Sequence, residues 1–203
     1  MPPSDADQRL LAASAAGDFV AIRKALADGA DPDARDAAGA PALMLATVAR
    51  AADAVRALID AEADVDAQDA DRFNPFLYAG AEGLLDILRL ANDAGADPAI
   101  TNRYGGVALI PASERGHVEV VRYLLSESDV DVDHVNDLGW TALLEAILLS
   151  DGGPRHQEIV RLLIEHGADV DLADADGVRP LTHARARGQR EVVGLLEAAD
   201  ATP

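Results

Sequence analysis

Gly29-Ala30-Asp31 returns along the chain as Glu62-Ala63-Asp64 and again as Gly95-Ala96-Asp97. Both steps between the aspartates are 33 residues long. A period in the low thirties is typical of a stack of small units, because a unit of that size cannot bury its apolar face alone. The sequence therefore predicts a repeat solenoid, an architecture that usually holds another macromolecule along its side surface.

Each unit contains a polar turn, a short apolar helix, a tight turn, a second amphipathic helix and an exit such as Gly-Ala-Asp. In the third unit, Asn74-Pro75 supplies an N-cap side chain and a proline at the first helical position. The second helix, which contains Leu84 to Ala91, is expected to end at Gly95, where the chain needs a left-handed residue.

These units resemble the ankyrin repeat. The matching motifs include Gly116-His117-Val118-Glu119-Val120-Val121, Gly139-Trp140-Thr141-Ala142-Leu143 and Gly167-Ala168-Asp169-Val170-Asp171. The resemblance covers about residues 7–199 and implies an all-α ankyrin solenoid of about six helix-turn-helix units joined by β-turn fingers. The segment from Asn102 to His117 is also similar to a subgroup of small bacterial ankyrin-repeat proteins, whose members are often exported and in some cases restrain or protect against a partner enzyme.

The predicted domain follows an N-terminal tail of residues 1–6 and contains units at about 7–34, 35–67, 68–100, 101–135, 136–172 and 173–200. The tight turns carry Gly17, Gly83, Gly116 and Gly188, with Arg50 in the corresponding place of the second unit. Five extra residues, Asp151–Arg155, are expected to form a Gly-Pro loop in the fifth unit. Such a loop serves either binding or no function at all.

Composition restricts the class of partner. The chain has 203 residues and a net charge of −19, which disfavours nucleic acid and anionic membrane surfaces as partners. It has no cysteine, so disulfides and thiolate metal sites are excluded. The N-terminus has no basic run followed by an apolar stretch, and no window has the roughly 18 apolar residues of a membrane helix. A cytoplasmic location is expected, and an exported form stays open if a leader has been removed.

Large side chains gather at the turn tips of units three to five. Interface hot spots favour aromatic residues and arginine because these supply large rigid contact areas and hydrogen-bond donors. Carried over from the family by position, the exposed first-helix residues add two charged side chains. The predicted partner-binding residues are Phe73, Arg103, Tyr104, Leu138, Trp140, Glu114 and Arg115. In the alternative interpretation, Phe73 and Trp140 pack against neighbouring turns and hold the fingers together.

The chain shows no motif for catalysis or for a bound metal. It has no Walker loop, no Gly-x-Ser-x-Gly and no His-Glu-x-x-His. The five histidines are spread over the last three units, and His117 is expected to bond backbone groups rather than a metal. The alternation of Asp129, Asp131 and Asp133 has the spacing of calcium ligands, but His134 stands where a glycine should follow. No cofactor, metal or catalytic residue is therefore predicted.

We interpret the chain as a monomeric, non-catalytic protein-binding module for a partner with a basic face. One specific form is a regulator or protector of a partner enzyme. The alternative is a scaffold or an engineered or selected ankyrin binder, and an enzyme is the third and least supported class.

Overall fold

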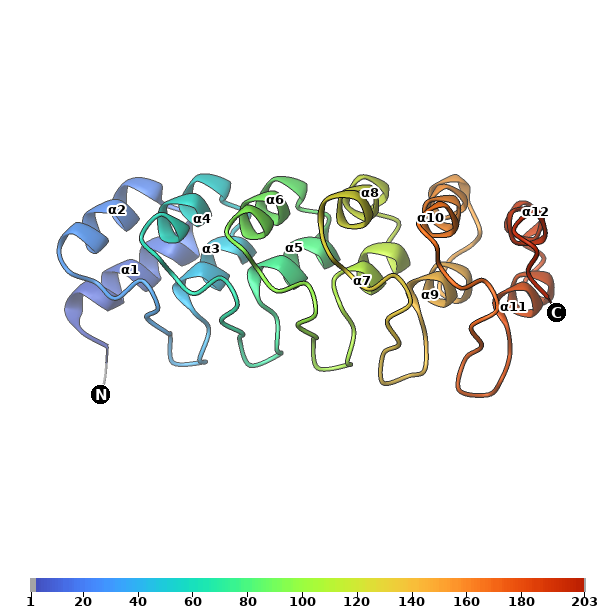
Figure 1. The fold of residues 1–203 in the computed structure, drawn as a ribbon. Helices are drawn as coiled ribbons and strands as arrows, with labels where there is room; N and C mark the ends of the chain where they lie inside the picture. The colour runs from blue at the N-terminus through green and yellow to red at the C-terminus, as the bar shows by residue number, and fades with distance from the viewer. Residues whose placement is uncertain (1–2, 203) are drawn as a thin grey trace. The chain divides into compact units, whose positions relative to one another are not determined.

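Pairs of helices joined by tight turns make up each repeat, and a long loop leads to the next pair (Figure 1). The computed structural model describes residues 3–202. In chain order the helices are α1 (Asp5–Ala16), α2 (Phe19–Ala27), α3 (Ala42–Val48), α4 (Ala52–Ile59), α5 (Pro75–Glu82), α6 (Leu85–Asp93), α7 (Leu109–Glu114), α8 (Val118–Glu127), α9 (Ala142–Leu148), α10 (Pro154–Glu165), α11 (Pro180–Ala186) and α12 (Arg190–Ala198). The predicted all-α ankyrin-type architecture of helix-turn-helix units is confirmed.

Local capping explains where the first helices of the repeats begin. Asn74 Oδ1 accepts a 2.8 Å hydrogen bond from the backbone N–H of Leu77, and Pro75 opens α5 as predicted. Thr141 caps α9 in the same way through the N–H of Leu144. No side chain caps α7, which has only six residues and carries Pro111 at its third position. The missing N–H of Pro111 costs little there, because the first helical N–H groups have no partner within the helix.

The long loops form fingers that are closed by one side chain at their base. Asp69 Oδ1 accepts hydrogen bonds of 2.9 Å from the N–H groups of both Asp71 and Phe73. Asn136 Oδ1 accepts two bonds of 3.0 Å, from Leu138 and Trp140. These bonds fix the finger backbone, so the side chains at each tip have defined positions.

The tight turns require a left-handed residue. Gly83 has a φ of 71° and Gly116 has a φ of 74°. Arg50 occupies the equivalent turn of the second repeat with a φ of 58°, as its spacing predicts. A side chain in this conformation is strained, so the backbone path is imposed by the repeat rather than by the local residue.

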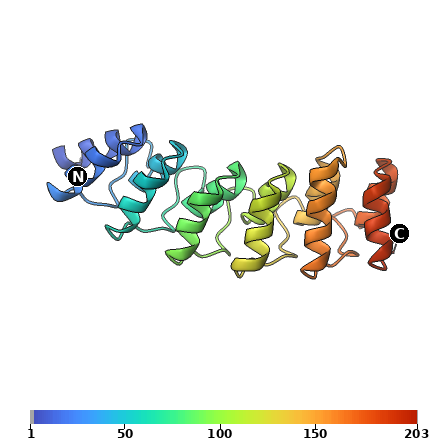
Figure 2. The same cartoon turned by 90° about the horizontal axis from the view of Figure 1, so that it is seen from above.

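Contacts divide the chain into two compact units, which we describe separately. The first unit contains residues up to 79 together with 84–103, and the second contains residues 80–83 together with 104 onward. In the first unit α1 packs on α3, α2 on α4, and α4 on α6. In the second unit α7 packs on α9, α9 on α11, α8 on α10, and α10 on α12. Within each unit the second helices of successive repeats lie side by side (Figure 2).

Each unit buries its own apolar core. In the first unit, Leu10, Ile22 and Leu58 are fully buried. In the second unit, Leu124 on α8 and Leu163 on α10 are fully buried. Burying one such side chain stabilises the fold by roughly 1.5–3 kcal/mol. Because these side chains pack between successive helices, stability depends on contacts between neighbouring repeats.

A series of aspartates connects successive repeats through their exit turns. In the connections between repeats, a carboxylate oxygen of one exit turn accepts a hydrogen bond from the backbone N–H of a residue in the next. At the N-terminal end the acceptor is Asp7 on α1, so that bond stays within the first repeat. In the first unit these bonds run from Asp31 to Asp7, from Asp64 to Asp33 and from Asp97 to Asp66, and in the second unit from Asp169 to Asp133 and from Thr202 to Asp171, at 2.7–3.0 Å. The alternating aspartates are thus a structural device of the repeat, and Asp133 has a backbone N–H as its partner.

Two helices begin at other residues than the expected boundaries suggest. Helix α1 begins at Asp5, inside the predicted tail 1–6, because Ser4 and Asp7 form a capping box. The Asp151–Arg155 insertion is not wholly a loop, since Pro154 and Arg155 form the first turn of α10. Proline is favourable at a first helical position, and this explains the longer helix.

Across residues 3–202, no helix is both long enough and apolar enough to span a bilayer.

Candidate interaction surface

In the first unit, Phe73 packs within its own repeat. Its half-buried ring meets the ring of Tyr78 edge to face, with centroids 6.0 Å apart and planes at 88°. Edge-to-face pairs of this kind are stabilising. The contact favours the structural interpretation of Phe73, although the ring packs on α5 rather than on a neighbouring turn.

Arg103 forms an exposed ion pair with the preceding finger. Its Nη1 lies 2.5 Å from Oδ1 of Asp71, and both side chains are more than half exposed. A solvent-exposed pair contributes little to stability, about 0–1 kcal/mol. Its carboxylate partner also reduces the positive charge that Arg103 offers to a binding partner.

In the second unit, Tyr104 and Leu138 are the exposed members of the predicted set. Tyr104 is 52% exposed and Leu138 is 55% exposed. Their fingers are joined directly, because the backbone N–H of Asp137 donates a 3.0 Å bond to the carbonyl of Tyr104. Gly105 permits this close approach, since a Cβ there would lie 2.5 Å from Asp137 Oδ1. Trp140 is only half-buried, so part of its surface remains accessible.

Two further exposed apolar residues of the second unit lie outside the predicted partner-binding set. Val135 is 46% exposed and lies just before the finger of the fifth repeat. Leu149 is 49% exposed and directly follows α9. The sequence indicates this exposure, because Leu148 and Leu149 extend the apolar stretch of the helix further than one buried face requires.

The predicted charged residues, Glu114 and Arg115, have well-defined surroundings. Arg115 Nη1 donates to the carbonyl of Ala81 at 2.9 Å and to Oε1 of Glu82 at 2.5 Å. The carbonyl of Glu114 lies 2.9 Å from Nε2 of His156. The side chain of Arg115 is therefore fixed by its bonds to Ala81 and Glu82.

Glu145 is a buried carboxyl that sequence reasoning did not select. It is 5% exposed, and Asn136 Nδ2 donates a 2.8 Å hydrogen bond to its Oε1. Burial, reinforced by the negative charge of Glu114, raises the pKa of Glu145 to about 7, and the Asn136 bond opposes that rise. The available signal was a glutamate in the middle of the apolar stretch Leu143-Leu144-Glu145-Ala146-Ile147.

The histidines contact protein groups rather than converging on a metal site. His117 Nε2 lies 3.1 Å from the Ala81 carbonyl, as the sequence predicted, and His134 Nε2 lies 2.7 Å from the Gly105 carbonyl. Within residues 3–202 no group of three or more His, Asp or Glu side chains is arranged to hold a metal ion.

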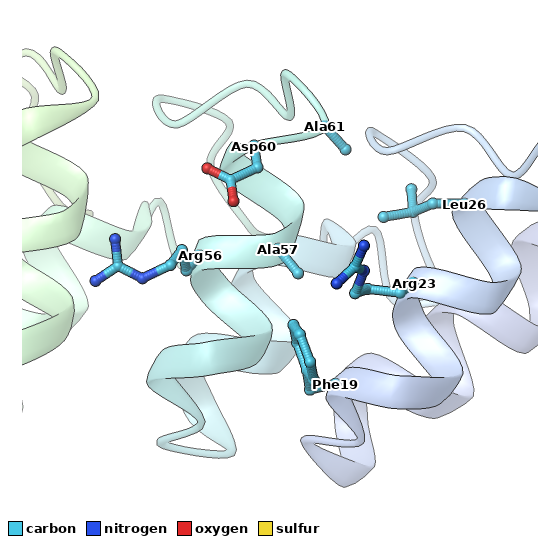
Figure 3. Close-up of a pocket in the computed structure, with 7 residues that line it drawn as sticks. All are labelled: Phe19, Arg23, Leu26, Arg56, Ala57, Asp60 and Ala61. Atoms are coloured by element: carbon cyan, nitrogen blue, oxygen red, sulfur yellow. The ribbon is translucent and has the colours of Figure 1, made fainter.

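The first unit also has an open cleft between α2 and α4 (Figure 3). Its volume is about 380 Å³, and the Arg23 guanidinium lies 5.6 Å from the centroid of the Phe19 ring. Arg56 extends away from Phe19 in this view. The charged residues that line this cleft are Arg23, Arg56 and Asp60.

The seven predicted residues thus fall into two sets. Phe73 and Arg103 lie in the first unit, where Phe73 packs on Tyr78 and Arg103 pairs with Asp71. The other five lie in the second unit, where Tyr104 and Leu138 occupy bonded fingers and Arg115 is anchored to Glu82.

Comparison with known proteins agrees with this geometry. The family model described as "Ankyrin repeats (3 copies)" matches residues 10–102, 77–174 and 109–202. The crystal structure of an ankyrin repeat domain from Acinetobacter baumannii AYE is 53% identical, with a TM-score of 0.92 over 95% of this chain and 98% of that chain. The crystal structure of EF0377, an ankyrin repeat protein, is 37% identical, with a TM-score of 0.91 over 94% and 97%.

A curated bacterial relative matches part of the chain. The ankyrin repeat protein YahD of Escherichia coli (strain K12) is 52% identical over 99 residues, which cover 49% of each chain. The chain thus spans about half the length of this relative. Ankyrin repeats are generally protein-interaction modules. With the repeats, the finger geometry and these matches in agreement, the chain belongs to the ankyrin repeat family.

Proposed function

We propose that the chain is a non-catalytic protein-binding module whose partner contacts the fingers of the second unit. The observation that supports this most is the pair of exposed apolar side chains, Tyr104 and Leu138, on two fingers joined by a backbone hydrogen bond. Large exposed apolar side chains on a rigid scaffold lose little conformational entropy when they bind. Trp140 and Leu149 extend the accessible apolar surface of the same unit.

Charge defines the kind of partner. The chain carries a net charge of −19, so a protein with a basic face is favoured and binding should weaken as salt rises. The first-unit residues Phe73 and Arg103 have a smaller role in this proposal, because each is already engaged by a neighbour. We place Glu114 and Arg115 at the edge of the contact surface.

The proposal is tested by co-purification with the full chain as bait at low and high salt. Tyr104→Ala with Leu138→Ala should remove specific partners that wild type retains. Val20→Ala is the matched control, because Val20 is 73% exposed on α2 in the first unit. If the double variant retains the same partners as wild type, the assignment to these fingers is wrong.

A more specific form of the proposal is regulation or protection of a partner enzyme in the same cell. It is tested by measuring the activity of the recovered partner with and without the chain, and unchanged activity excludes it. In that case the alternative role is a scaffold. We also propose that the chain acts as a monomer, which sedimentation at several concentrations would check.

A further inference from the structure

The insertion in the fifth repeat builds a cavity at the start of α10, which we call the α10 cavity. Helix α10 has 12 residues, whereas α8 has 10 and α12 has 9. His156 lies beside Gly116 of the preceding repeat, where its Cε1 would lie 3.3 Å from an added Cβ, as His117 lies beside Gly83. The cavity is open to solvent, has a volume of about 250 Å³ and is lined by Arg115, Asp151, Gly153, Pro154, Arg155 and His156. The charged residues among these, Arg115, Asp151 and Arg155, are exposed.

Two guanidinium groups line the α10 cavity. The side chain of Arg155, on α10, makes no hydrogen bond or ion pair with the described residues. Arg115 uses Nη1 for Ala81 and Glu82, and its position is fixed by these bonds. Guanidinium groups present several N–H donors in a planar fork that matches the oxygens of an oxyanion. The guanidinium groups that line the cavity therefore have N–H donors that make no hydrogen bond within the described residues.

The positive charges of Arg115 and Arg155 both act on the imidazole of His117. Burial lowers the pKa of His117, and the charges of Arg115 and Arg155 lower it further. The hydrogen bond to the Ala81 carbonyl and the charge of Glu82 act in the opposite direction. Arg115 and Arg155 thus both act on His117, at the tight turn between α7 and α8.

The backbone and His156 add to this arrangement. No side chain caps the N-terminus of α10, because Gly153 occupies the N-cap position. Pro154 has no N–H and the Gly153 N–H is donated to Asp151, so the N–H groups of Arg155 and His156 carry the positive pole of the helix dipole at this end. His156 is oriented by its 2.9 Å contact to the Glu114 carbonyl.

Asp151 determines which oxyanion fits. Its Oδ1 accepts a 2.8 Å hydrogen bond from the N–H of Gly153, so the carboxylate is held at the cavity. A carboxylate repels a fully deprotonated anion but accepts a hydrogen bond from an anion that keeps a proton. Near neutral pH inorganic phosphate keeps a proton and sulfate does not.

We propose that the α10 cavity binds inorganic phosphate, with Arg155 and Arg115 as donors and Asp151 as the acceptor of the phosphate proton. The same chemistry could be offered by a phosphorylated side chain, but a phosphate monoester has a second pKa of about 6 and loses its last proton at higher pH. Inorganic phosphate is therefore the favoured ligand at pH 8. This site is separate from the fingers and does not depend on the proposed protein partner.

The test is an NMR titration of the full ¹⁵N-labelled chain at pH 8 and constant ionic strength, with inorganic phosphate, sulfate and phosphoserine in separate arms. Phosphate should give saturable shifts at the Gly153, Arg155 and His156 amides. The affinity for sulfate and for phosphoserine should be lower than that for phosphate by a factor of about ten or more. Equal affinity for sulfate and phosphate, tighter binding of phosphoserine, or no saturable shift would overturn the assignment.

Three variants separate the roles of the lining residues. Arg155→Ala should weaken phosphate binding about ten-fold or more, through loss of charge-assisted hydrogen bonds. Arg161→Ala is the control, because Arg161 lies on the same helix but pairs with Glu158. Asp151→Asn should bring sulfate to within about three-fold of phosphate, because the repelling charge is lost. Unchanged phosphate affinity in Arg155→Ala, with an unchanged amide spectrum elsewhere, would show that the cavity is not the site.

Discussion

The side-chain amide of Asn136 donates a 2.8 Å hydrogen bond to Glu145, which joins the base of a finger to helix α9. The bond holds a carboxyl group that is 5% exposed, and burial raises the pKa of that group to about 7. The ordinary pKa of a glutamate is 4.5. The folded chain therefore holds a proton on Glu145 at pH values where the unfolded chain has lost it.

This difference gives a pH dependence with a definite sign. Between pH 4.5 and about 7 the folded state binds more protons than the unfolded state, so the free energy of unfolding falls as pH rises. The full effect of Glu145 is on the order of 3 kcal/mol. Glu145→Gln should remove it, leaving the variant more stable than wild type at pH 8 and similar at pH 5.

Urea unfolding of both proteins from pH 5 to pH 8 is the measurement. Comparing the variant with wild type cancels the contributions of other groups, such as Asp66 and Asp133, whose pKa values are also raised by burial. Parallel stability curves for the two proteins would show that Glu145 titrates normally in the fold.

The aspartate series makes a prediction about neighbouring repeats. Asp33 Oδ1 accepts a 2.7 Å hydrogen bond from the N–H of Asp64, so Asp33→Ala should lower the free energy of unfolding by about 1 kcal/mol. Asp93→Ala is the control, because Asp93 is exposed at the end of α6, and it should change stability by less than about 0.5 kcal/mol. Thermal unfolding of the two variants is the measurement. Equal changes in melting temperature would mean that the Asp33 hydrogen bond does not contribute to stability.

Two leucines of the second unit should separate stability from binding. Leu124 is fully buried, so Leu124→Ala should cost roughly 2–5 kcal/mol. Leu138 is 55% exposed, so Leu138→Ala should change the free energy of unfolding by less than about 0.5 kcal/mol while weakening partner binding. Denaturant unfolding checks the first effect and co-purification the second. A large loss of stability in Leu138→Ala would show that this side chain is structural.

Glu62 offers a route to a more stable protein. It occupies the place that Gly29, Gly95 and Gly167 hold in other exit turns, with a φ of 64°. Glu62→Gly relieves the left-handed strain and should raise the free energy of unfolding by about 0.5–1 kcal/mol. Ala61→Gly, one residue earlier, is the control and should not stabilise. A lower melting temperature for Glu62→Gly would indicate that the glutamate makes a compensating contact.

Much of the backbone was predictable because the repeat fixes it. The place of Arg50 in a tight turn followed from spacing alone, and its φ of 58° agrees. The cap at Asn74 was also predictable, since capping depends on residues close in sequence. The start of α1 was missed because the Ser4–Asp7 capping box lies in a segment with no repeat pattern to compare.

Side-chain environments were less predictable because they depend on what the fold brings together. The sequence predicted Phe73 as a partner-binding residue, whereas in the structure its ring packs edge to face with that of Tyr78. The apolar stretch around Glu145 was a signal for burial, but its hydrogen bond to Asn136 depends on how the finger folds against α9. Part of the Asp151–Arg155 insertion is helical, because Pro154 is favourable at the first position of α10.

The aspartate series has a consequence for how such a chain can change in length. Each carboxylate binds a main-chain N–H, which nearly every residue possesses, so the bond places no demand on the identity of its recipient. Duplication or deletion of one whole repeat therefore leaves a usable acceptor at the newly formed junction. Ala99 is an exception: it stands where the first two exit turns carry Asp33 and Asp66, and it has no side-chain oxygen to offer.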